Sequence, residues 1–525
     1  MRHAWRALVL GFLVAGLALG VPTSAPAAGK TVVVGITADA VILDPPQVLS
    51  ATDRKYAMNM FDGLVEQELG SFKIVPSLAE RWEVAKDGLS YTFQLRKGVT
   101  FHDGTPFDAE AAAFSLDRVI NPANPYNKFG RFIYATTRLG QVKSVEALDK
   151  YVLRINLKAP FAPLLDYLAN DGHIVSPAAI KKHEKDIGAN PVGTGPFKFV
   201  RWERGKRLVM EKNPSYWKGA PKIDQLILVP MPEAQTRLIA LRTGQVDFIE
   251  GVPPDNLADL KRDPNIVVAA GLSPQAWYVV LNTKRVKALG DVRVRRALSH
   301  AVNKEAIVKD ALKGTGVVGL GPLSPLLAPY AVSAKEVPVY EYDPEKAKRL
   351  LAEAGYASGF DVTLSVPESG TGMQSPVAMA TLIQANLAAV GVRVKLQTYE
   401  WGAYQKIRRE GDFDMAAFSW TVGIGNPDII LYAKFHSTEH ASAQHPSYNN
   451  SYFADPEVDR GLEQARVELD DAKRVALYKQ IQKKIVDSAD HLWVDHEITL
   501  VAMNKRVRNF KIHPQIHYFW AVDAN

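Results

Sequence analysis

The stretch Leu78–Asp108 constrains the fold more than any other part of the chain. It reads LAERWEVAKDGLSYTFQLRKGVTFHDGTPFD. A turn at Lys86-Asp87-Gly88 separates two segments in which apolar and polar residues alternate, a pattern typical of two antiparallel strands. In the second segment, Tyr91–Leu95, the large apolar side chains share one face. Asp108 is placed to cap a helix that begins at Ala109, so the stretch predicts a β-hairpin followed by a helix.

The chain is too long for one ordinary core, because 525 residues normally divide into two or three domains. Predicted strands and helices alternate along it, which indicates the α/β class. A helix is expected from about Thr52 to Leu64, and two apolar strands are expected at Leu492–Val494 and Ile498–Ala502. Beyond the N-terminus no long apolar run occurs, so the mature chain is not expected to span a membrane.

The N-terminus has the three parts of a signal peptide. Arg2 and Arg6 form a short basic region, Ala7–Leu19 is apolar, and Ala25-Pro26-Ala27 fits a small-x-small cleavage site. The alternative is an uncleaved membrane anchor, although the apolar region is short for a span. The chain contains no cysteine, so no lipid-modified cysteine is available. We therefore expect a free periplasmic protein, with residues 1–28 as the signal peptide.

Composition excludes several classes of function. With no cysteine there are no disulfides, no cysteine-ligated zinc and no thiol nucleophile. The net charge of +7 comes from dispersed basic residues mixed with acids, which does not indicate a nucleic-acid surface. The segment Gly314–Gly319 has the letters of a dinucleotide fingerprint, but a predicted helix precedes it and Pro322 follows it. The sequence has neither a G-x-S-x-G elbow nor a phosphate-binding loop.

The order of side chains in Leu78–Asp108 resembles a segment of the family 5 extracytoplasmic solute-binding proteins, the receptors of ABC importers for peptides, nickel chelates and related solutes. Four further segments resemble the same family and keep its order: Gly193–Gly219, Asp291–Val308, Tyr342–Gly355 and Leu382–Trp420. The resemblance covers the chain from about Lys30 to the C-terminus.

The resemblance implies an α/β, type II-like periplasmic binding protein with two lobes, a hinge, and an extra domain in the first lobe. Solute would be held between the lobes, and closure would be a hinge motion. The expected division is residues 29–62, 195–274 and 492–525 for lobe I, 63–194 for the extra domain, and 275–491 for lobe II.

The leading ligand loop is Trp420–Asp428, which follows a predicted strand at Asp414–Ser419. Loops at strand ends bind ligands in open α/β sheets, although a turn with a core tryptophan is the structural alternative. The family's dipeptide receptors carry an aspartate three residues after this tryptophan and an arginine before the Leu382 helix. This chain has Gly423 and Gly370 there. A free dipeptide is therefore not expected, and a longer peptide or a less charged solute fits better. The candidate ligand-binding residues are Trp420, Thr421, Gly423, Asn426, Asp428, Trp401, Tyr404, Thr52, Asp53 and Gly370.

Three groups of candidates have structural alternatives. Trp401 and Tyr404 line the same site or pack as an aromatic pair in the core. Thr52 and Asp53 supply polar contacts from lobe I, or Ser50 or Thr52 caps a helix. A loop with the histidines His436, His440 and His445 holds a metal only if their imidazoles converge, and a solvated loop is the default. No metal or cofactor is expected.

The expected function is capture of a peptide or peptide-like solute and its delivery to ABC permease subunits in the inner membrane, without chemistry. A monomer with no nucleic-acid partner is expected. Within the same family the alternatives are receptors for a nickel or other metal chelate, an opine or an oligosaccharide. The alternative from another class is a secreted hydrolase, which needs a nucleophile and base or an open metal site.

Overall fold

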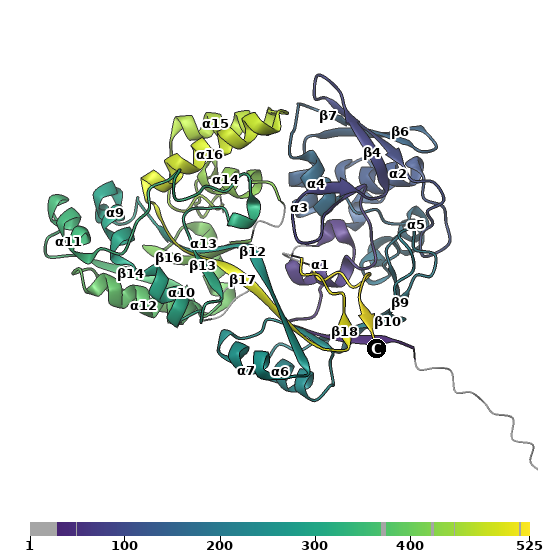
Figure 1. Ribbon diagram of the computed structural model, residues 1–525. Coiled ribbons are helices and arrows are strands. Elements are labelled where there is room, and N and C mark those ends of the chain that lie inside the picture. The colour runs from purple at the N-terminus through teal and green to yellow at the C-terminus, as the bar shows by residue number, and fades with distance from the viewer. Residues whose placement is uncertain (1–28, 49, 369–373, 422–424, 446, 514–515) are drawn as a thin grey trace, which may run out of the picture.

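The chain forms two bodies joined by two long strands (Figure 1). The computed structural model describes residues 29–525 with the exception of 49, 369–373, 422–424, 446 and 514–515. One body holds most of the N-terminal half, drawn in purple and blue, and the other holds the teal and green segments. The yellow C-terminal segment returns to the first body, so the chain crosses between the bodies twice.

A single mixed sheet runs through both bodies. Its strands are β1 (Thr31–Ile36), β8 (Phe197–Glu203), β9 (Arg207–Lys212), β10 (Gln225–Pro230), β11 (Phe248–Glu250), β12 (Ile266–Leu281), β13 (Gly316–Val318), β14 (Asp361–Pro367), β15 (Arg393–Tyr399), β16 (Met415–Thr421) and β17 (His491–Asn504). Their order is β15-β14-β16-β12-β17-β11-β1-β10-β9-β8, and β13 also pairs with β17. We call the body with β1 and β8–β11 lobe I, and the body with β13–β16 lobe II.

The strands β12 and β17 carry the chain between the lobes. In lobe I their pairing is regular up to Leu272 and Ile498. The register then shifts, Ala276 and Trp277 lie opposite His496 and Asp495, and a second shift precedes the regular lobe II pairing that starts with Tyr278 opposite Trp493. Such an irregularity bends and weakens a ladder locally. We call this place the crossing, and it is where the two lobes are expected to move relative to each other.

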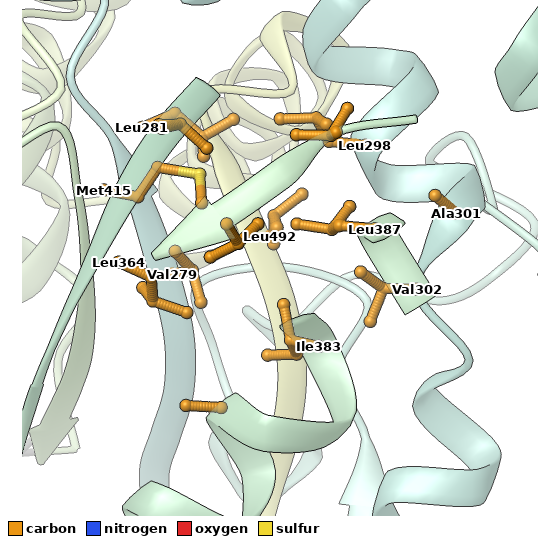
Figure 2. Packing of buried hydrophobic residues seen from close by; sticks show 14 of the residues in the cluster. Val279, Leu281, Leu298, Ala301, Val302, Leu364, Ile383, Leu387, Met415 and Leu492 are labelled. Atoms are coloured by element: carbon orange, nitrogen blue, oxygen red, sulfur yellow. The ribbon is translucent and has the colours of Figure 1, made fainter. Parts of the chain in front are cut away.

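Lobe II buries both faces of its sheet. Its helices are α8 (Lys287–Gly290), α9 (Val292–Ala301), α10 (Lys304–Asp310), α11 (Pro344–Glu353), α12 (Pro376–Ala388), α13 (Trp401–Glu410), α14 (Asp428–Phe435), α15 (Pro456–Val467) and α16 (Asp471–Ser488). Side chains of β12 alternate between two cores. Val279 and Leu281 pack with Leu298 of α9 and Ile383 of α12 (Figure 2). Tyr278 and its neighbours pack on the other face against α14, α15 and α16.

Lobe I is built around parallel strands. β1 pairs in parallel with β10 and β11, and Val32 and Val34 of β1 enter a core closed by Phe519 and Val522 from the C-terminal tail. The helices that pack on this lobe are α1 (Ala51–Ala57), α6 (Ala234–Arg242), α7 (Leu257–Arg262) and α5 (Pro177–His183), the last of which comes from the segment expected for the extra domain. The tail ends in a two-stranded sheet of β18 (Val507–Arg508) and β19 (Asp523–Ala524). The tail therefore fixes the C-terminus to the lobe in which the mature chain is expected to begin.

A separate four-stranded sheet forms the extra domain. It consists of β4 (Ala79–Val84), β5 (Ser90–Leu95), β6 (Val142–Asp149) and β7 (Val152–Leu157), in the order β4-β5-β7-β6. The helices are α2 (Ala109–Ile120), α3 (Ile133–Arg138) and α4 (Leu164–Asp171), and β2 (Val65–Gln67) pairs with β3 (Ile74–Pro76). The predicted hairpin and helix are confirmed. Tyr91, Phe93 and Leu95 are buried on one face, and Asp108 accepts a hydrogen bond from the Ala111 amide at 3.0 Å.

Two predicted elements were wrong in extent. The two expected C-terminal strands are one strand, β17, because the polar residues between them stay in the ladder with β12 and β13. Helix α1 ends at Ala57 instead of near Leu64. The side chain of Asn59 donates to the His517 carbonyl at 2.9 Å and accepts from the Phe519 amide at 3.0 Å, which holds the chain in a non-helical path. Within the described residues, none of the helices has the length and apolar character of a membrane span.

Candidate functional site

The predicted ligand loop begins beside the crossing. β16 pairs with β12 so that Trp420 lies opposite Ala276 and Thr421 lies opposite Gln275. The Trp420 ring is half-buried and meets the Tyr448 ring edge-on, with centroids 4.5 Å apart. The end of β16 therefore places Trp420 where the two lobes meet. The positions 370 and 423, where the family's dipeptide receptors have ionic groups, lie outside the described residues.

The end of the loop connects lobe II to the extra domain. Asn426 donates from Nδ2 to Asp166 Oδ2 at 2.9 Å. Asp428, which is fully buried, accepts a hydrogen bond from the Tyr167 hydroxyl at 3.0 Å. The guanidinium of Arg466 donates to the same carboxylate at 2.7 Å and 3.2 Å. The polar groups of Asn426 and Asp428 thus bond to other residues of the protein, and these contacts hold lobe II against the extra domain.

Backbone and ring contacts extend the same interface. The amide of Ala162 in the extra domain donates to the carbonyl of Arg466 in lobe II at 2.8 Å. Phe72, in the turn between β2 and β3, packs against the aromatic core of lobe II. A Cβ added at Gly425 would lie 2.2 Å from the Cβ of Phe72. The absence of a side chain at position 425 therefore permits this close approach, and the structure is a closed arrangement on this side.

Two buried carboxyl groups lie on β17 next to the crossing, and the sequence did not single them out. Neither carboxyl oxygen of Asp495 has a hydrogen-bond partner in the described part of the chain, and burial raises its pKa well above the usual value. Glu497 accepts from the Gln374 amide at 3.2 Å, and burial raises its pKa to about 7. The signal available in the sequence was a charged pair, Asp495 and Glu497, inside a strand-forming apolar region.

The pair Trp401 and Tyr404 packs in the core of lobe II. Tyr404 is fully buried and donates its hydroxyl to the carbonyl of Ala417 on β16. The Trp401 ring stacks on Tyr404 with centroids 6.2 Å apart and contacts the same core. Burial raises the pKa of the Tyr404 hydroxyl. These contacts match the alternative in which the two rings pack as an aromatic pair in the core.

The lobe I candidates, Thr52 and Asp53, lie in the first turn of α1, which Ser50 caps. Ser50 Oγ accepts from the Asp53 amide at 3.1 Å and donates to Asp53 Oδ2 at 2.8 Å. Asp53 Oδ1 accepts from the Val41 amide at 2.6 Å. Ser50 is thus the N-cap of α1, and Thr52 follows it half-buried in the first turn. The Asp53 carboxylate is buried and has protein partners on both oxygens.

The three loop histidines do not converge. His436 is buried, stacks on Tyr432 at 4.3 Å and contacts Thr438 Oγ1 at 2.7 Å. His440 Nε2 lies 2.9 Å from the Phe453 carbonyl, whereas His445 is exposed. Among the described residues, no three or more histidine, aspartate or glutamate side chains are arranged to hold a metal ion.

Comparison with known proteins decides the family. Residues 73–442 match the family described as bacterial extracellular solute-binding proteins, family 5. This chain belongs to that family. The solute-binding protein is 32% identical to heme-binding protein A of Haemophilus influenzae over 511 residues, which cover 94% of this chain and 92% of the relative. It is 34% identical to the dipeptide-binding protein of Escherichia coli over 472 residues, which cover 87% of each chain.

Solved structures confirm the fold of this solute-binding protein. The structure of HbpA2 from Haemophilus parasuis superposes with a TM-score of 0.84 at 32% identity, covering 94% of this chain and all of that one. The periplasmic binding protein DppA from Helicobacter pylori, in complex with the peptide STSA, gives a TM-score of 0.78 at 31% identity, covering 94% and 98%. The expected mixed α/β periplasmic binding protein fold is therefore confirmed across nearly the whole chain.

Proposed function

We propose that this protein captures a peptide or peptide-like solute between lobe I and lobe II and delivers it to the permease subunits of an ABC importer. Relatives named for di- and tripeptides, dipeptides and glutathione support the ligand class. The mechanism needs only an open–closed equilibrium that the solute shifts, with no chemical step. The permease then accepts the closed, loaded form.

The observation that carries this proposal is the pair of strands that crosses between the lobes. β12 and β17 have regular pairing in each lobe and two register shifts at the crossing, between Leu272 and Ala276 and between Trp277 and Tyr278, which is a geometry for hinge motion. On the closed side, Asn426 and Asp428 already join lobe II to the extra domain. We assign the solute to the space beside Trp420 and Thr421, next to the crossing. Closure around the solute forms the contacts of Asn426 and Asp428.

The protein is further proposed to act in the periplasm, as a single chain with defined domain boundaries. Residues 1–28 act as a signal peptide, and the absence of cysteine leaves the exported protein without a lipid anchor in the periplasm. The protein acts as a monomer. Its domains are divided at 62/63, 194/195, 274/275 and 491/492. The third of these boundaries falls inside the register shift of β12, whereas the fourth falls at the start of β17, ahead of the crossing, where Leu492 and Val494 still pack in the core of lobe II.

The proposed solute is longer or less charged at its ends than a free dipeptide. Gly423 and Gly370 stand where the family's dipeptide receptors place an aspartate and an arginine. A buried ammonium or carboxylate without a partner is strongly disfavoured. The variant Gly423→Asp is expected to create a preference for peptides with a free α-amino group over their N-acetylated forms. An unchanged ranking of these two ligand sets would contradict this part of the proposal.

Native mass spectrometry of the protein purified from its own periplasm tests the function directly. A retained peptide of several residues, with a matching rise in melting temperature when that peptide is added back, is the expected result. A retained metal chelate, opine or oligosaccharide would replace the peptide with an alternative ligand of the family. Conversion of the added peptide into products would overturn the receptor and favour a secreted hydrolase.

A further inference from the structure

Four aromatic rings gather on one face of lobe II behind the end of β16. Tyr278 on β12 lies opposite Phe418 on β16 in the ladder, and their centroids are 6.0 Å apart. Trp420 lies two positions along β16 and therefore on the same face. Tyr448 meets Trp420 with centroids 4.5 Å apart. We call Tyr278, Phe418, Trp420 and Tyr448 the aromatic cluster.

Lys434 on α14 projects its ammonium group onto this cluster. Its Nζ lies 4.9 Å from the centroids of both Tyr278 and Phe418, and 5.4 Å from the centroid of Trp420. The residue is completely buried, and within the described ranges Nζ has neither a hydrogen-bond nor an ion-pair partner. Burial lowers the pKa of this amine well below its usual value, and the nearby Arg408 lowers it further.

A second cation approaches the same rings from α13. The guanidinium carbon of Arg408 lies 5.2 Å from the Phe418 centroid and 5.9 Å from the Tyr448 centroid. The side chain is buried, and its Nε has no hydrogen-bond partner among the residues that the structure describes. Arg408 and Lys434 therefore share the Phe418 ring as a neighbour. Two cations this close repel each other unless an anion joins them.

Two neutral donors belong to the same set. The Tyr278 hydroxyl and the Trp420 indole Nε1 are buried, and neither has a partner in the described part of the molecule. Together with Lys434 Nζ and Arg408 Nε they make four donors without a partner among the described residues, contributed by β12, β16, α13 and α14. Buried polar groups normally have partners, so several donors that surround one aromatic cluster without an acceptor indicate a missing acceptor.

The nearest acid does not supply that acceptor. The charge of Asp490 raises the pKa of Lys434, but its carboxylate accepts hydrogen bonds from Ser451 at 2.6 Å and Ser488 at 2.8 Å. It also pairs with His491 at 3.1 Å. Attraction to the aromatic faces stabilises a buried ammonium only in part, because the loss of hydration is the larger effect. Packing alone therefore does not account for a lysine at this position.

We propose that Lys434, Arg408, Trp420 and Tyr278 form an anion subsite of lobe II that takes a carboxylate group of the captured solute. Trp420 and Tyr448 are half-buried, whereas Lys434 and Arg408 are buried, so we expect the carboxylate to enter beside Trp420. This inference rests on the proposed function and adds the charge of the ligand to it. The preferred solute carries an acidic side chain or an equivalent carboxylate.

The test compares two tripeptides of nearly equal shape, Ala-Glu-Ala and Ala-Gln-Ala, by isothermal titration calorimetry. The wild-type protein is expected to bind the glutamate peptide at least tenfold more tightly. Lys434→Met and Arg408→Gln are expected to remove this preference by weakening the binding of Ala-Glu-Ala. The exposed neighbours on α13 provide matched controls, so Lys406→Met and Arg409→Gln should keep the preference.

Equal affinities for the two peptides in the wild type, or a preference that survives both Lys434→Met and Arg408→Gln, would overturn the anion subsite. Failure of every peptide to bind would contradict the proposed ligand class instead. In that event succinate serves as the probe in a thermal-stability assay. Stabilisation of the wild type but not of Lys434→Met supports the subsite, and equal responses contradict it. Circular dichroism checks that Lys434→Met folds. The ligand-free melting temperature of this variant should not fall, because the substitution removes a buried charge.

Discussion

The hydroxyl of Tyr167 in the extra domain donates a hydrogen bond to the carboxylate of Asp428 at the start of α14, over 3.0 Å. The two residues belong to bodies that are linked through the crossing strands, so the bond exists only when lobe II lies against the extra domain. Burial and the neighbouring Asp428 charge raise the pKa of the Tyr167 hydroxyl well above its usual value, so it remains a donor. The hydrogen bond between Tyr167 and Asp428 is therefore a marker of the closed state.

Tyr167→Phe is expected to weaken solute binding about fivefold. The change removes one hydrogen bond to a charged group from the closed state, at a cost of about 1 kcal/mol, while Arg466 keeps Asp428 paired. Calorimetric titration with the solute identified by mass spectrometry measures the effect. Tyr151→Phe, in the same domain, is the control and should bind as the wild type does. An unchanged dissociation constant for Tyr167→Phe would show that this bond does not contribute to closure.

Gly425→Ala is expected to hinder closure through volume. The new Cβ would lie 2.2 Å from the Phe72 Cβ, far inside the contact distance of two carbon atoms, which is about 3.5–4.0 Å. The clash disappears when the lobes separate, so solute affinity should fall at least tenfold while the ligand-free melting temperature stays within about 2 °C. In the control Gly290→Ala, the nearest atom to the added Cβ is the Thr283 carbonyl oxygen at 3.5 Å, so affinity should be unaffected. Wild-type affinity in Gly425→Ala would show that the closed contact is not needed for binding.

Local features of the fold were predictable from the sequence. Asp108 and the alternating segment before it are neighbours in the chain, so cap and hairpin followed from short-range rules. The strand predicted at Asp414–Ser419 is present as β16 and extends through Trp420 to Thr421, and the role of Trp420 in a ligand loop remains a prediction. In contrast, α1 ends early because Asn59 bonds to residues of the C-terminal tail, and no local pattern indicates such a partner.

The parts of the site that were missed depend on distant partners. Asp495 and Glu497 resembled a break between two strands, because charged residues seldom lie inside a buried ladder. Lys434 and Arg408 occur in ordinary helices, and only the pairing of β12 with β16 brings the aromatic cluster beneath them. Asn426 and Asp428 were predicted as ligand contacts, which remains a prediction, and the structure gives them partners in the extra domain, at Asp166 and Tyr167.

Tyr404→Phe is expected to lower stability without changing solute binding. The variant leaves the Ala417 carbonyl without its tyrosine donor in a fully buried setting, at a cost of about 1–2 kcal/mol. Denaturant unfolding of the ligand-free protein measures the loss. Tyr399→Phe removes a hydroxyl from a half-buried ring nearby and is the control. A loss of solute affinity in Tyr404→Phe as large as the loss of stability would return Tyr404 to the ligand site.

Glu497→Gln is expected to stabilise the protein at pH 8 but not at pH 4.5. Burial raises the pKa of Glu497 from 4.5 to about 7, so the folded state binds this proton more tightly than the unfolded chain does. The favourable contribution of the neutral group is complete below pH 4.5 and is lost as the pH rises to about 7, which amounts to about 3 kcal/mol. Glutamine stays neutral and accepts from the Gln374 amide, so the variant avoids this loss.

Melting temperatures of the wild type and Glu497→Gln, measured across pH 4.5–8, test whether the stabilisation by glutamine grows as the pH rises. The difference should be near zero at the acid end, grow through the interval and level off above pH 7. Asp495 is the titratable neighbour, and burial also raises its pKa; it is present in both proteins and shifts in the same direction as Glu497, so it does not reverse the trend. The exposed Glu353 provides the control variant Glu353→Gln, which should show no such growth. A pH-independent difference would mean that Glu497 is not a buried neutral acid at the crossing.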